Sequence, residues 1–290
     1  MPPQSKFSAL LQLIRFDKPI GTLLLLWPTL WALWIAAEGV PDPTILVIFV
    51  VGTFLMRSAG CIVNDLADRH LDGGVARTQH RPLVTGAVTV NEALILCAAL
   101  CMVAFVLVLF TNPLTIGLSL VAVLLAAIYP FMKRFTNLPQ IILGAAFSWG
   151  IPMAFAAQSE TLPTALWLLY TGNLLWTVVY DTKYAMVDRE DDLKMGVRST
   201  AILFGDADRA VIACLQVLCL LALYLAGANF ELGYYYNGSL IIAAGLFLYH
   251  QHLIKERKPD ACFRAFKHNN WVGLVIFTGI ALHYQFGPGT

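Results

Sequence analysis

The sequence contains few charged residues. Only 13% of its 290 residues are Asp, Glu, Lys or Arg, whereas soluble domains average about 25%. Hydrophobic residues make up 58% of the chain, and the mean hydropathy is +0.70. These values exclude an ordinary soluble domain and indicate an all-α, polytopic membrane protein that lies in a lipid bilayer. The net charge of +1 indicates nothing about nucleic acid, and we expect no nucleic-acid partner.

The chain also lacks the common cysteine patterns and catalytic motifs. Its six cysteines form no C-x-x-C pair and no metal-site spacing with histidine, so we interpret them as small apolar residues of buried helices. The motifs G-x-S-x-G, G-x-x-x-x-G-K-[ST] and H-E-x-x-H are absent as well. These absences argue against a serine hydrolase, a P-loop nucleotidase and a zinc protease. No histidine is assigned a role.

Long apolar runs fill most of the chain. A membrane-spanning helix needs about 20 mostly apolar residues. We expect nine spans, the eighth of them short: residues 20–37, 44–63, 93–110, 114–132, 138–157, 165–180, 210–226, 240–251 and 271–286. Proline-containing turns separate several runs, because proline fits the first turn of a helix but not its interior. No linker divides the chain, so we interpret residues 1–290 as one domain.

The basic residues support this topology. All 19 Lys and Arg residues lie in the N-terminal tail or around the connections after the second, fourth, sixth and eighth runs. The opposite side carries only Glu38, Asp42, Glu160 and Glu231. Because cytoplasmic loops carry the excess of Lys and Arg, we expect a cytoplasmic N-terminus and a C-terminus on the other side of the membrane.

Two acidic stretches each follow an even-numbered run and therefore share the cytoplasmic face: the first motif, residues 64–72, and the second motif, residues 181–192. If each helix continues through its motif at about 100° per residue, the carboxylates form stripes. The first stripe contains Asp65, Asp68 and Asp72 beside Asn64 and Arg57. The second contains Asp181, Asp188 and Asp192 beside Tyr184. The pair Asp68 and Asp72 precedes the pair Asp188 and Asp192 by 120 positions.

Carboxylates on one stripe repel one another unless a cation joins them. Magnesium ions prefer oxygen ligands and commonly bridge one or two carboxylates to substrate phosphates. The two motifs therefore predict a shared site for Mg²⁺ and a diphosphate, with nearby basic side chains neutralising the phosphate oxygens. The candidates for that role are Arg57, Arg69, Arg77, Lys183, Lys194 and Arg198.

Other interpretations of these residues are open at this point. The acidic residues also fit helix ends that meet water, and Arg57 fits a side chain that reaches from its helix to the membrane surface. A cation or anion transporter is a rival function, although transport sites lie near the bilayer midplane. The carboxylates here lie at one end of their helices, which favours a one-sided enzyme over a transporter or a non-catalytic scaffold.

The motifs resemble those of the UbiA superfamily of intramembrane aromatic prenyltransferases. The resemblance rests on Asn64-Asp65-x-x-Asp68-Arg69-x-x-Asp72 and on Asp181-x-x-Tyr184-Ala185-x-x-Asp188-Arg189-x-Asp191-Asp192. It extends over nearly the whole chain, through Arg15-x-Asp17-Lys18-Pro19, Leu26-Trp27-Pro28, Arg77-Thr78-x-x-Arg81-Pro82, Tyr129-Pro130-Phe131-Met132-Lys133-Arg134 and Gly196-Val197-Arg198.

The resemblance implies nine helices around a central cavity that opens to the cytoplasmic side, in the inner membrane of a bacterium. It implies Mg²⁺-dependent transfer of a polyprenyl group from polyprenyl diphosphate to an aromatic acceptor. The segments 27–33 and 129–134 favour 4-hydroxybenzoate, in ubiquinone biosynthesis, over homogentisate, dihydroxynaphthoate, haem or chlorophyllide.

The resemblance also assigns residues. It makes Asp68, Asp72, Asp188 and Asp192 the main metal-associated carboxylates, with Asn64 and Asp65 in support. It makes Arg134 the residue that holds the carboxylate of the aromatic acid. Walls that keep water from a carbocation need apolar and aromatic side chains. The candidates for these walls are Trp27, Trp31, Phe147, Trp149 and Tyr180.

Overall fold

The computed structural model describes residues 5–69, 72–74 and 77–287. In this part of the chain all regular structure is helical. The α-helices are α1 (Lys6–Leu13), α2 (Ile20–Ala36), α3 (Pro43–Asp68), α4 (Val90–Val108), α5 (Pro113–Ile128), α6 (Pro139–Ser148), α7 (Gly150–Ser159), α8 (Leu166–Ala185), α9 (Arg189–Met195), α10 (Thr200–Phe204), α11 (Asp208–Asn229), α12 (Tyr234–Leu253) and α13 (Pro259–Phe286). Short 3₁₀ helices are η1 (Asp72–Gly74), η2 (Tyr129–Arg134), η3 (Gly205–Ala207) and η4 (Ile254–Glu256).

Each of the nine expected spans lies in helical structure. Five helical stretches are long and apolar enough to cross a membrane: Pro43–Asp68, Val90–Val108, Pro113–Arg134, Pro139–Ser159 and Thr200–Asn229. The prediction of an all-α protein with several membrane-length helices is therefore confirmed, whereas the nine-span topology stays a prediction. The expected short eighth span, residues 240–251, lies within the 20-residue helix α12, which begins with three tyrosines.

Proline turns start helices where the sequence indicated. Asp42 precedes Pro43, and its carboxylate accepts hydrogen bonds from the backbone amides of Thr44 and Ile45, which have no partner within the helix. Before Pro113, the side-chain carbonyl of Asn112 accepts a hydrogen bond from the backbone amide of Thr115. The expected span 138–157 is divided into α6 and α7 at Trp149. Pro152 lies in the first turn of α7, where its missing amide hydrogen costs no hydrogen bond.

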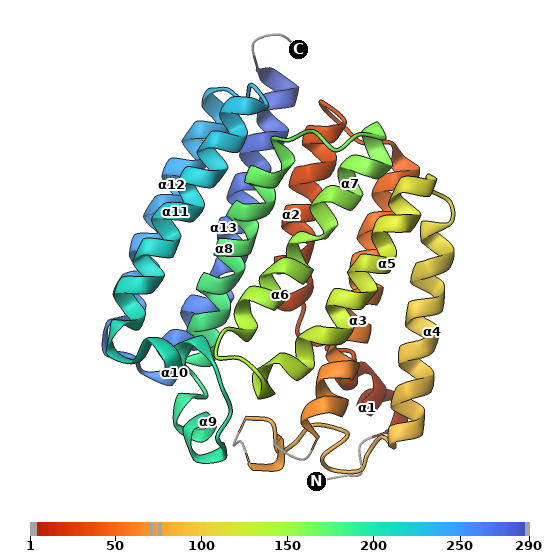
Figure 1. Ribbon diagram of the computed structural model, residues 1–290, viewed down its shortest axis with the longest axis vertical. Coiled ribbons are helices and arrows are strands. Elements are labelled where there is room, and N and C mark those ends of the chain that lie inside the picture. The colour runs from red at the N-terminus through yellow and green to blue at the C-terminus, as the bar shows by residue number, and fades with distance from the viewer. Residues whose placement is uncertain (1–4, 70–71, 75–76, 288–290) are drawn as a thin grey trace.

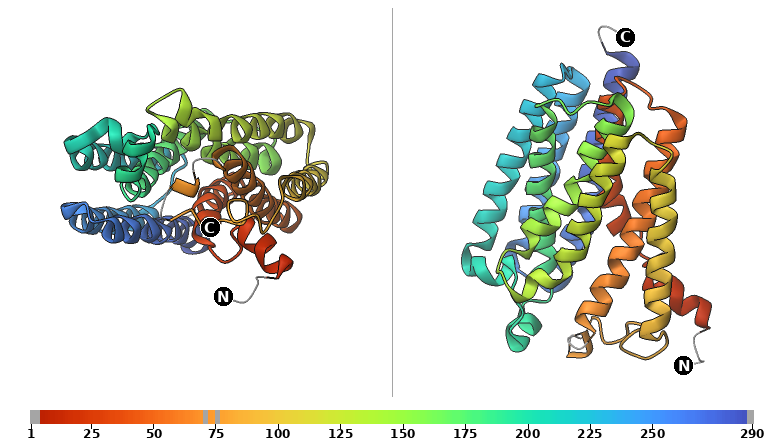
Figure 2. Two further views of the ribbon diagram at one scale, coloured as in Figure 1. Left: turned by 90° about the horizontal axis from the view of Figure 1, so that it is seen from below. Right: turned by 45° about the vertical axis from the view of Figure 1, so that its right-hand side comes forward.

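The long helices run along the long axis of the molecule (Figure 1). In Figures 1 and 2, α11, α12 and α13 form one side and α3, α4 and α5 the other. Helices α2, α6, α7 and α8 lie between these groups. Helices α1 and α9 lie at one end of the bundle, which we call the α9 end, and the last turn of α13 lies at the opposite end. An odd number of crossings requires such an arrangement of the two ends of the chain.

Tryptophans fix the central helices to one another. Three indole nitrogens bond to one turn of α13: Trp27 to Asn270, Trp31 to the Gly273 carbonyl and Trp176 to Asn269. The stacked rings of Trp31 and Trp176 are both fully buried, and they join α2 to α8. Because their indoles are used in this way, Trp27 and Trp31 belong to the core and not to the cavity wall that we expected.

Candidate functional site

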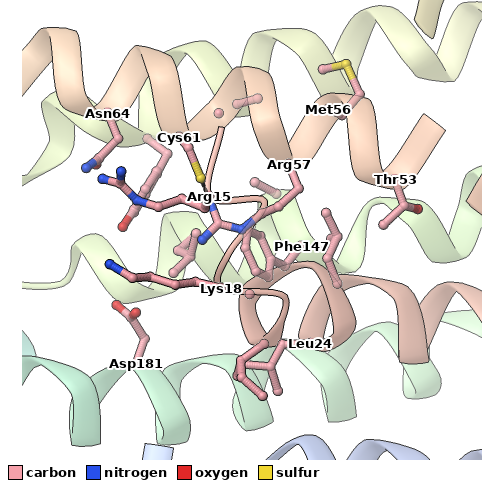
Figure 3. A pocket seen from close by; sticks show the side chains of 18 of the residues that line it. Arg15, Lys18, Leu24, Thr53, Met56, Arg57, Cys61, Asn64, Phe147 and Asp181 are labelled. Atoms are coloured by element: carbon pink, nitrogen blue, oxygen red, sulfur yellow. Dashed lines mark hydrogen bonds between the residues drawn. The ribbon is translucent and has the colours of Figure 1, made fainter. Parts of the chain in front are cut away.

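A large cavity of about 1030 Å³ opens between the helices. Its polar half lies toward the α9 end and contains charged residues of both acidic motifs. Its other half is lined by apolar side chains that include Leu24, Met56 and Phe147. Figure 3 shows this division, with Asn64, Arg15, Lys18 and Asp181 on one side and Thr53, Met56, Leu24 and Phe147 on the other. The cavity therefore suits a ligand with a charged head and an apolar body.

The first motif lies mainly on α3. The helix extends past the expected end at residue 63 and carries Asn64, Asp65 and Asp68 on its last two turns. Asp72 follows in η1, so the assumption of a continuous helical stripe fails between Asp68 and Asp72. The carboxylates of Asp65 and Asp72 are nevertheless close together, as the contact of Arg81 with both of them shows.

The carboxylates of the first motif are neutralised by cations. Arg15 donates from Nη2 to both oxygens of Asp65, each at 2.8 Å. Arg81 Nη1 lies 2.9 Å from Asp65 and 2.5 Å from Asp72. Lys133 Nζ lies 2.9 Å from Asp68 Oδ2. All three aspartates are buried, so these ion pairs replace the water that a buried carboxylate would otherwise need.

The second motif is divided between two helices. Asp181 and Tyr184 lie on α8, which ends at Ala185. Asp188 precedes α9 with a φ of −100° and a ψ of 7°, values outside an α-helix, and Asp192 lies on α9 itself. The predicted single stripe through these three aspartates is therefore wrong, because the chain leaves the axis of α8 before Asp188. The three carboxylates nevertheless line the same cavity.

The second motif is less neutralised than the first. Arg77 contacts both oxygens of Asp188, donates to the Tyr184 hydroxyl and lies 4.6 Å from the centre of the Tyr184 ring. Within the described residues, Asp181 and Asp192 form no ion pair. Burial and the neighbouring Asp188 carboxylate raise the pKa of Asp192 to about 6. A cation at this position would offset both effects.

The structure brings most of the predicted site residues to the cavity wall. These are Arg57, Asn64, Asp65, Arg77, Asp181, Tyr184, Asp188, Asp192 and Arg198. The guanidinium of Arg57 packs against Gly21, where a Cβ atom would lie 2.6 Å from Nη2. Its Nη1 lies 2.7 Å from the Cys61 sulfur, and its Nε has no partner in the described structure. Arg57 therefore faces the cavity and does not reach for the membrane surface.

Other predicted residues lie elsewhere. Asp68 and Asp72 are behind the wall, paired with Lys133 and Arg81, which do line it. Arg69 is exposed at the end of α3. The exposed Lys194 lies 3.5 Å from Asp191. Arg134 donates to the Ala67 carbonyl, outside the wall.

Lys183 is fully buried on the far side of α8. Its Nζ lies 3.1 Å from His250 Nδ1 and packs over Phe247. Lys183 is therefore no candidate for a phosphate contact, contrary to our expectation. Its sequence neighbour Tyr184 points into the cavity because consecutive helical residues are about 100° apart.

The three cavity cations that pair with the first motif, Arg15, Arg81 and Lys133, were not selected from the sequence. Each lies in a segment that carries the family resemblance, and this was the one feature of the sequence that could have identified them as site residues. The resemblance indicated Arg134, whereas its sequence neighbour Lys133 lines the cavity. On the 3₁₀ helix η2 consecutive residues differ by about 120° in direction, so only Lys133 enters the cavity.

The oxygen-rich donor set fits a hard divalent cation. In the described part of the chain no three His, Cys, Asp or Glu side chains are close enough to form a complete metal cage. A complete cage is not what Mg²⁺ requires, because it binds through one or two carboxylates, water and substrate phosphates. Asp181, Asp188, Asp192 and the amide of Asn64 line one cavity beside several cations. This arrangement fits a metal that binds together with a diphosphate.

Comparison with known proteins agrees with these features. The sequence matches the UbiA prenyltransferase family over residues 25–271. A 4-hydroxybenzoate octaprenyltransferase of Saccharophagus degradans is 62% identical over 279 residues, which cover 96% of this chain and 93% of the relative. The enzyme of the same name from Aeromonas hydrophila is 60% identical over 276 residues, which cover 95% of this chain and 96% of the relative.

Solved structures share the fold. A UbiA homologue from Aeropyrum pernix K1 superposes with a TM-score of 0.80 at 24% identity, covering 90% of this chain and 97% of that one. A homologue from Archaeoglobus fulgidus, solved with GPP and Mg²⁺, gives a TM-score of 0.71 at 16% identity and covers 94% and 99% of the two chains. By its sequence match and its relatives, this chain belongs to the UbiA prenyltransferase family.

Proposed function

We propose that the chain transfers a polyprenyl group from polyprenyl diphosphate to 4-hydroxybenzoate, at the ring carbon ortho to the hydroxyl, giving 3-polyprenyl-4-hydroxybenzoate for ubiquinone biosynthesis. Relatives about 60% identical over most of the chain are named 4-hydroxybenzoate octaprenyltransferase. The observation that carries the proposal is one cavity with a charged half formed by two acidic motifs and an apolar half beside it. That division matches a donor with a diphosphate head and a hydrocarbon chain.

The charged half is proposed to bind the diphosphate. Asp181, Asp188 and Asp192 would hold Mg²⁺ directly, with the Asn64 amide in support. The remaining proposed metal ligands, Asp65, Asp68 and Asp72, could contribute after their basic partners turn to the phosphate oxygens. When bound, Mg²⁺ would neutralise the leaving diphosphate and so favour cleavage of the allylic C–O bond.

Basic side chains supply the rest of the neutralising charge. Arg77, Arg81 and Lys133 line the cavity beside the acidic residues, and each already contacts a carboxylate. A diphosphate bound there exchanges protein carboxylates for phosphate oxygens as partners of these cations. Arg198 also lines this half. Together these residues stabilise negative charge that increases as the C–O bond breaks.

The apolar half is proposed to protect the reacting carbon. Phe147, Trp149 and Tyr180 line the cavity, in agreement with the sequence prediction for its walls. They exclude water, which would otherwise capture an allylic carbocation. The acceptor ring then attacks through its ortho carbon, and a carboxylate takes the ring proton. Asp188 is our candidate for that base, because it is a carboxylate of the second motif that lines the cavity.

The carboxylate of the acceptor requires a cationic partner. The family resemblance suggests Arg134, and this assignment stays a prediction, since Arg134 bonds to the Ala67 carbonyl in the structure. Its neighbour Lys133 lines the cavity and is an alternative partner. Substitution of each residue separates the two possibilities.

The proposed location is the inner membrane of a bacterium, with the N-terminus and the acidic motifs on the cytoplasmic side and the C-terminus in the periplasm. Its membrane-length apolar helices and its bacterial relatives support this placement. We further propose that residues 1–290 form one domain, because the cavity is lined by residues from Gln12 to Lys267.

The acceptor is tested with membranes that contain the protein, supplied with Mg²⁺, a prenyl diphosphate and a panel of aromatic acids. We expect the mass of prenylated 4-hydroxybenzoate to dominate. Preferential prenylation of homogentisate or dihydroxynaphthoate would contradict the proposed acceptor but not the transferase activity. Flux of Mg²⁺ through liposomes without any prenyl donor would instead support the transporter.

A further inference from the structure

A second charged cluster lies behind the second motif and outside the cavity wall. Asp208, at the start of α11, is fully buried. Arg257 Nε lies 3.1 and 3.0 Å from the two carboxylate oxygens of Asp208, and its Nη2 lies 2.9 Å from Oδ1. Arg189 Nη2 donates to Oδ2 of the same carboxylate. One buried aspartate thus holds two arginines.

These three residues come from separate segments. Arg189 is the first residue of α9, Asp208 is the first of α11, and Arg257 follows η4, just before α13. Arg257 has a φ of +53°, in the left-handed region that few non-glycine residues adopt. Its Nη2 also donates to the Asp206 carbonyl at 2.8 Å. The cluster therefore connects the start of α9 to the starts of the long helices α11 and α13.

Apart from the contact of Arg77 with Asp188, the residue before it, helix α9 has few other anchors. It has seven residues, none of which is buried, and a helix this short is not stable by itself. Gly196 ends it in the left-handed conformation with a φ of +67°. By contrast, the first motif continues a 26-residue helix that packs over its length. The position of α9 must come from its side-chain contacts.

Arg189 is placed to transmit that anchoring to the cavity. It follows Asp188 directly, while Asp188 and Asp192 face the cavity. The Asp188 carbonyl accepts a hydrogen bond from the Asp192 amide at 2.8 Å, so the two aspartates lie in one hydrogen-bonded turn. A shift of Arg189 therefore moves both carboxylates together.

We propose that Asp208 is a positioning residue that sets the geometry of Asp188 and Asp192 through Arg189, with Arg257 as its second anchor. The inference rests on the proposed function, in which these two aspartates hold Mg²⁺ with a diphosphate. Groups that orient metal ligands commonly change metal affinity by about 10–100-fold when they are removed. Asp208 touches neither the cavity nor the reacting atoms, so its effect acts through α9.

Four full-length proteins test this role: the wild type, Asp208→Asn, Arg257→Gln and Asp206→Asn. Mg²⁺ is titrated in the presence of inorganic pyrophosphate, and the midpoint is read from the shift in thermal unfolding. Hydrogen–deuterium exchange of residues 189–195 is measured without metal. Asp206→Asn is the matched control, since it removes the same charge two residues away and its exposed side chain is not part of the cluster.

Asp208→Asn should raise the Mg²⁺ midpoint by about 10-fold or more and speed exchange in residues 189–195. Arg257→Gln keeps the contact of Asp208 with Arg189 and should cause a smaller change in the same direction. Asp206→Asn should match the wild type. If Asp208→Asn shows faster exchange or a lower unfolding temperature but an unchanged Mg²⁺ midpoint, Asp208 has only a structural role and the proposal is overturned.

Failure of the proposed function would look different. A wild-type protein with no response to Mg²⁺ and pyrophosphate contradicts the metal site itself, and with it the inference that rests on it. A normal wild-type response with an unchanged midpoint in Asp208→Asn contradicts only the role of Asp208. If Asp208→Asn does not fold, Arg257→Gln decides, and a wild-type midpoint in that variant overturns the proposal.

Discussion

The two acidic motifs meet at one cavity but are built in different ways. The first continues the 26-residue helix α3, and its aspartates are paired with Arg15, Arg81 and Lys133. The second crosses a break between α8 and the short helix α9, and it leaves Asp181 and Asp192 without an ion pair in the described structure. The first motif is thus rigid and neutralised, whereas the second has carboxylates available for a cation.

This difference suggests a division of labour. The cations of the first motif can turn to a diphosphate, while the carboxylates of the second can bind a metal. If both motifs were unpaired, the cavity would carry too much negative charge without a metal. If both were paired with basic residues, no carboxylate would be available to bind the metal. The comparison predicts that the charges of the first motif contribute mainly to stability and those of the second mainly to binding.

Removal of a carboxylate from the second motif should have the largest effect on activity. Asp188→Ala takes away a proposed metal ligand and leaves Arg77 without its partner. We expect prenyl transfer to fall by more than about 100-fold, measured as product mass in membranes with matched protein levels. Near wild-type transfer by this variant would end the metal-site interpretation of the second motif.

The first motif should instead show the largest effect on stability. Asp65 is 1% exposed, and Asp65→Asn removes the charged partner that the half-buried Arg15 and Arg81 share, so that Arg81 keeps only Asp72. Loss of one member of a buried ion pair costs about 3–5 kcal/mol. Thermal unfolding in detergent should show a clear drop in the unfolding temperature. A variant as stable as the wild type would mean that these ion pairs are not what supports the first motif.

Asp192→Asn should affect stability in the opposite direction, by a smaller amount and only at some pH values. Because the folded chain raises the pKa of Asp192 to about 6, the ionised carboxylate destabilises the fold above that pH. Without metal, the variant should unfold at a slightly higher temperature than the wild type at pH 7. The difference should vanish below about pH 3, where the wild-type carboxyl is protonated in both states. A lower unfolding temperature at pH 7 would contradict this assignment.

The smallest expected effects separate Lys133 from Arg134. Lys133→Ala should raise the KM for the prenyl donor, because Lys133 faces the diphosphate end of the cavity. Arg134→Ala should raise the KM for the aromatic acid more than that for the donor, if the assignment by resemblance holds. Steady-state kinetics with each substrate varied in turn measures both. Equal effects of Arg134→Ala on the two substrates would argue against a carboxylate contact.

Much of the fold follows from the sequence because apolar periodicity and proline turns are local signals. Pro43 and Pro113 start helices where they were expected, and α3 carries Asn64, Asp65 and Asp68 on its continuation. The break after α8 could not be predicted in this way. Nothing in residues 186–188 forbids a helix, and the chain turns there because Asp188 and Arg189 find partners in distant segments.

The candidate site was predictable in its residue types but less so in its pairings. Asp188 and Asp192 reach the cavity as expected, whereas Asp68 and Asp72 lie behind Lys133 and Arg81. Spacing along one helix cannot reveal contacts with residues far away in the chain. Asp208 shows this most clearly, since its partners lie 19 and 49 positions away and neither belongs to a motif with it.

The central claim is that the two motifs together bind a metal–diphosphate donor for prenyl transfer. Its most direct test is the formation of prenylated 4-hydroxybenzoate by wild-type membranes with Mg²⁺ and after chelation with EDTA. The account predicts a product of the expected mass with Mg²⁺, its loss with EDTA and its return when Mg²⁺ is added back. Undiminished product in EDTA, or no product with Mg²⁺ and both substrates present, would contradict it.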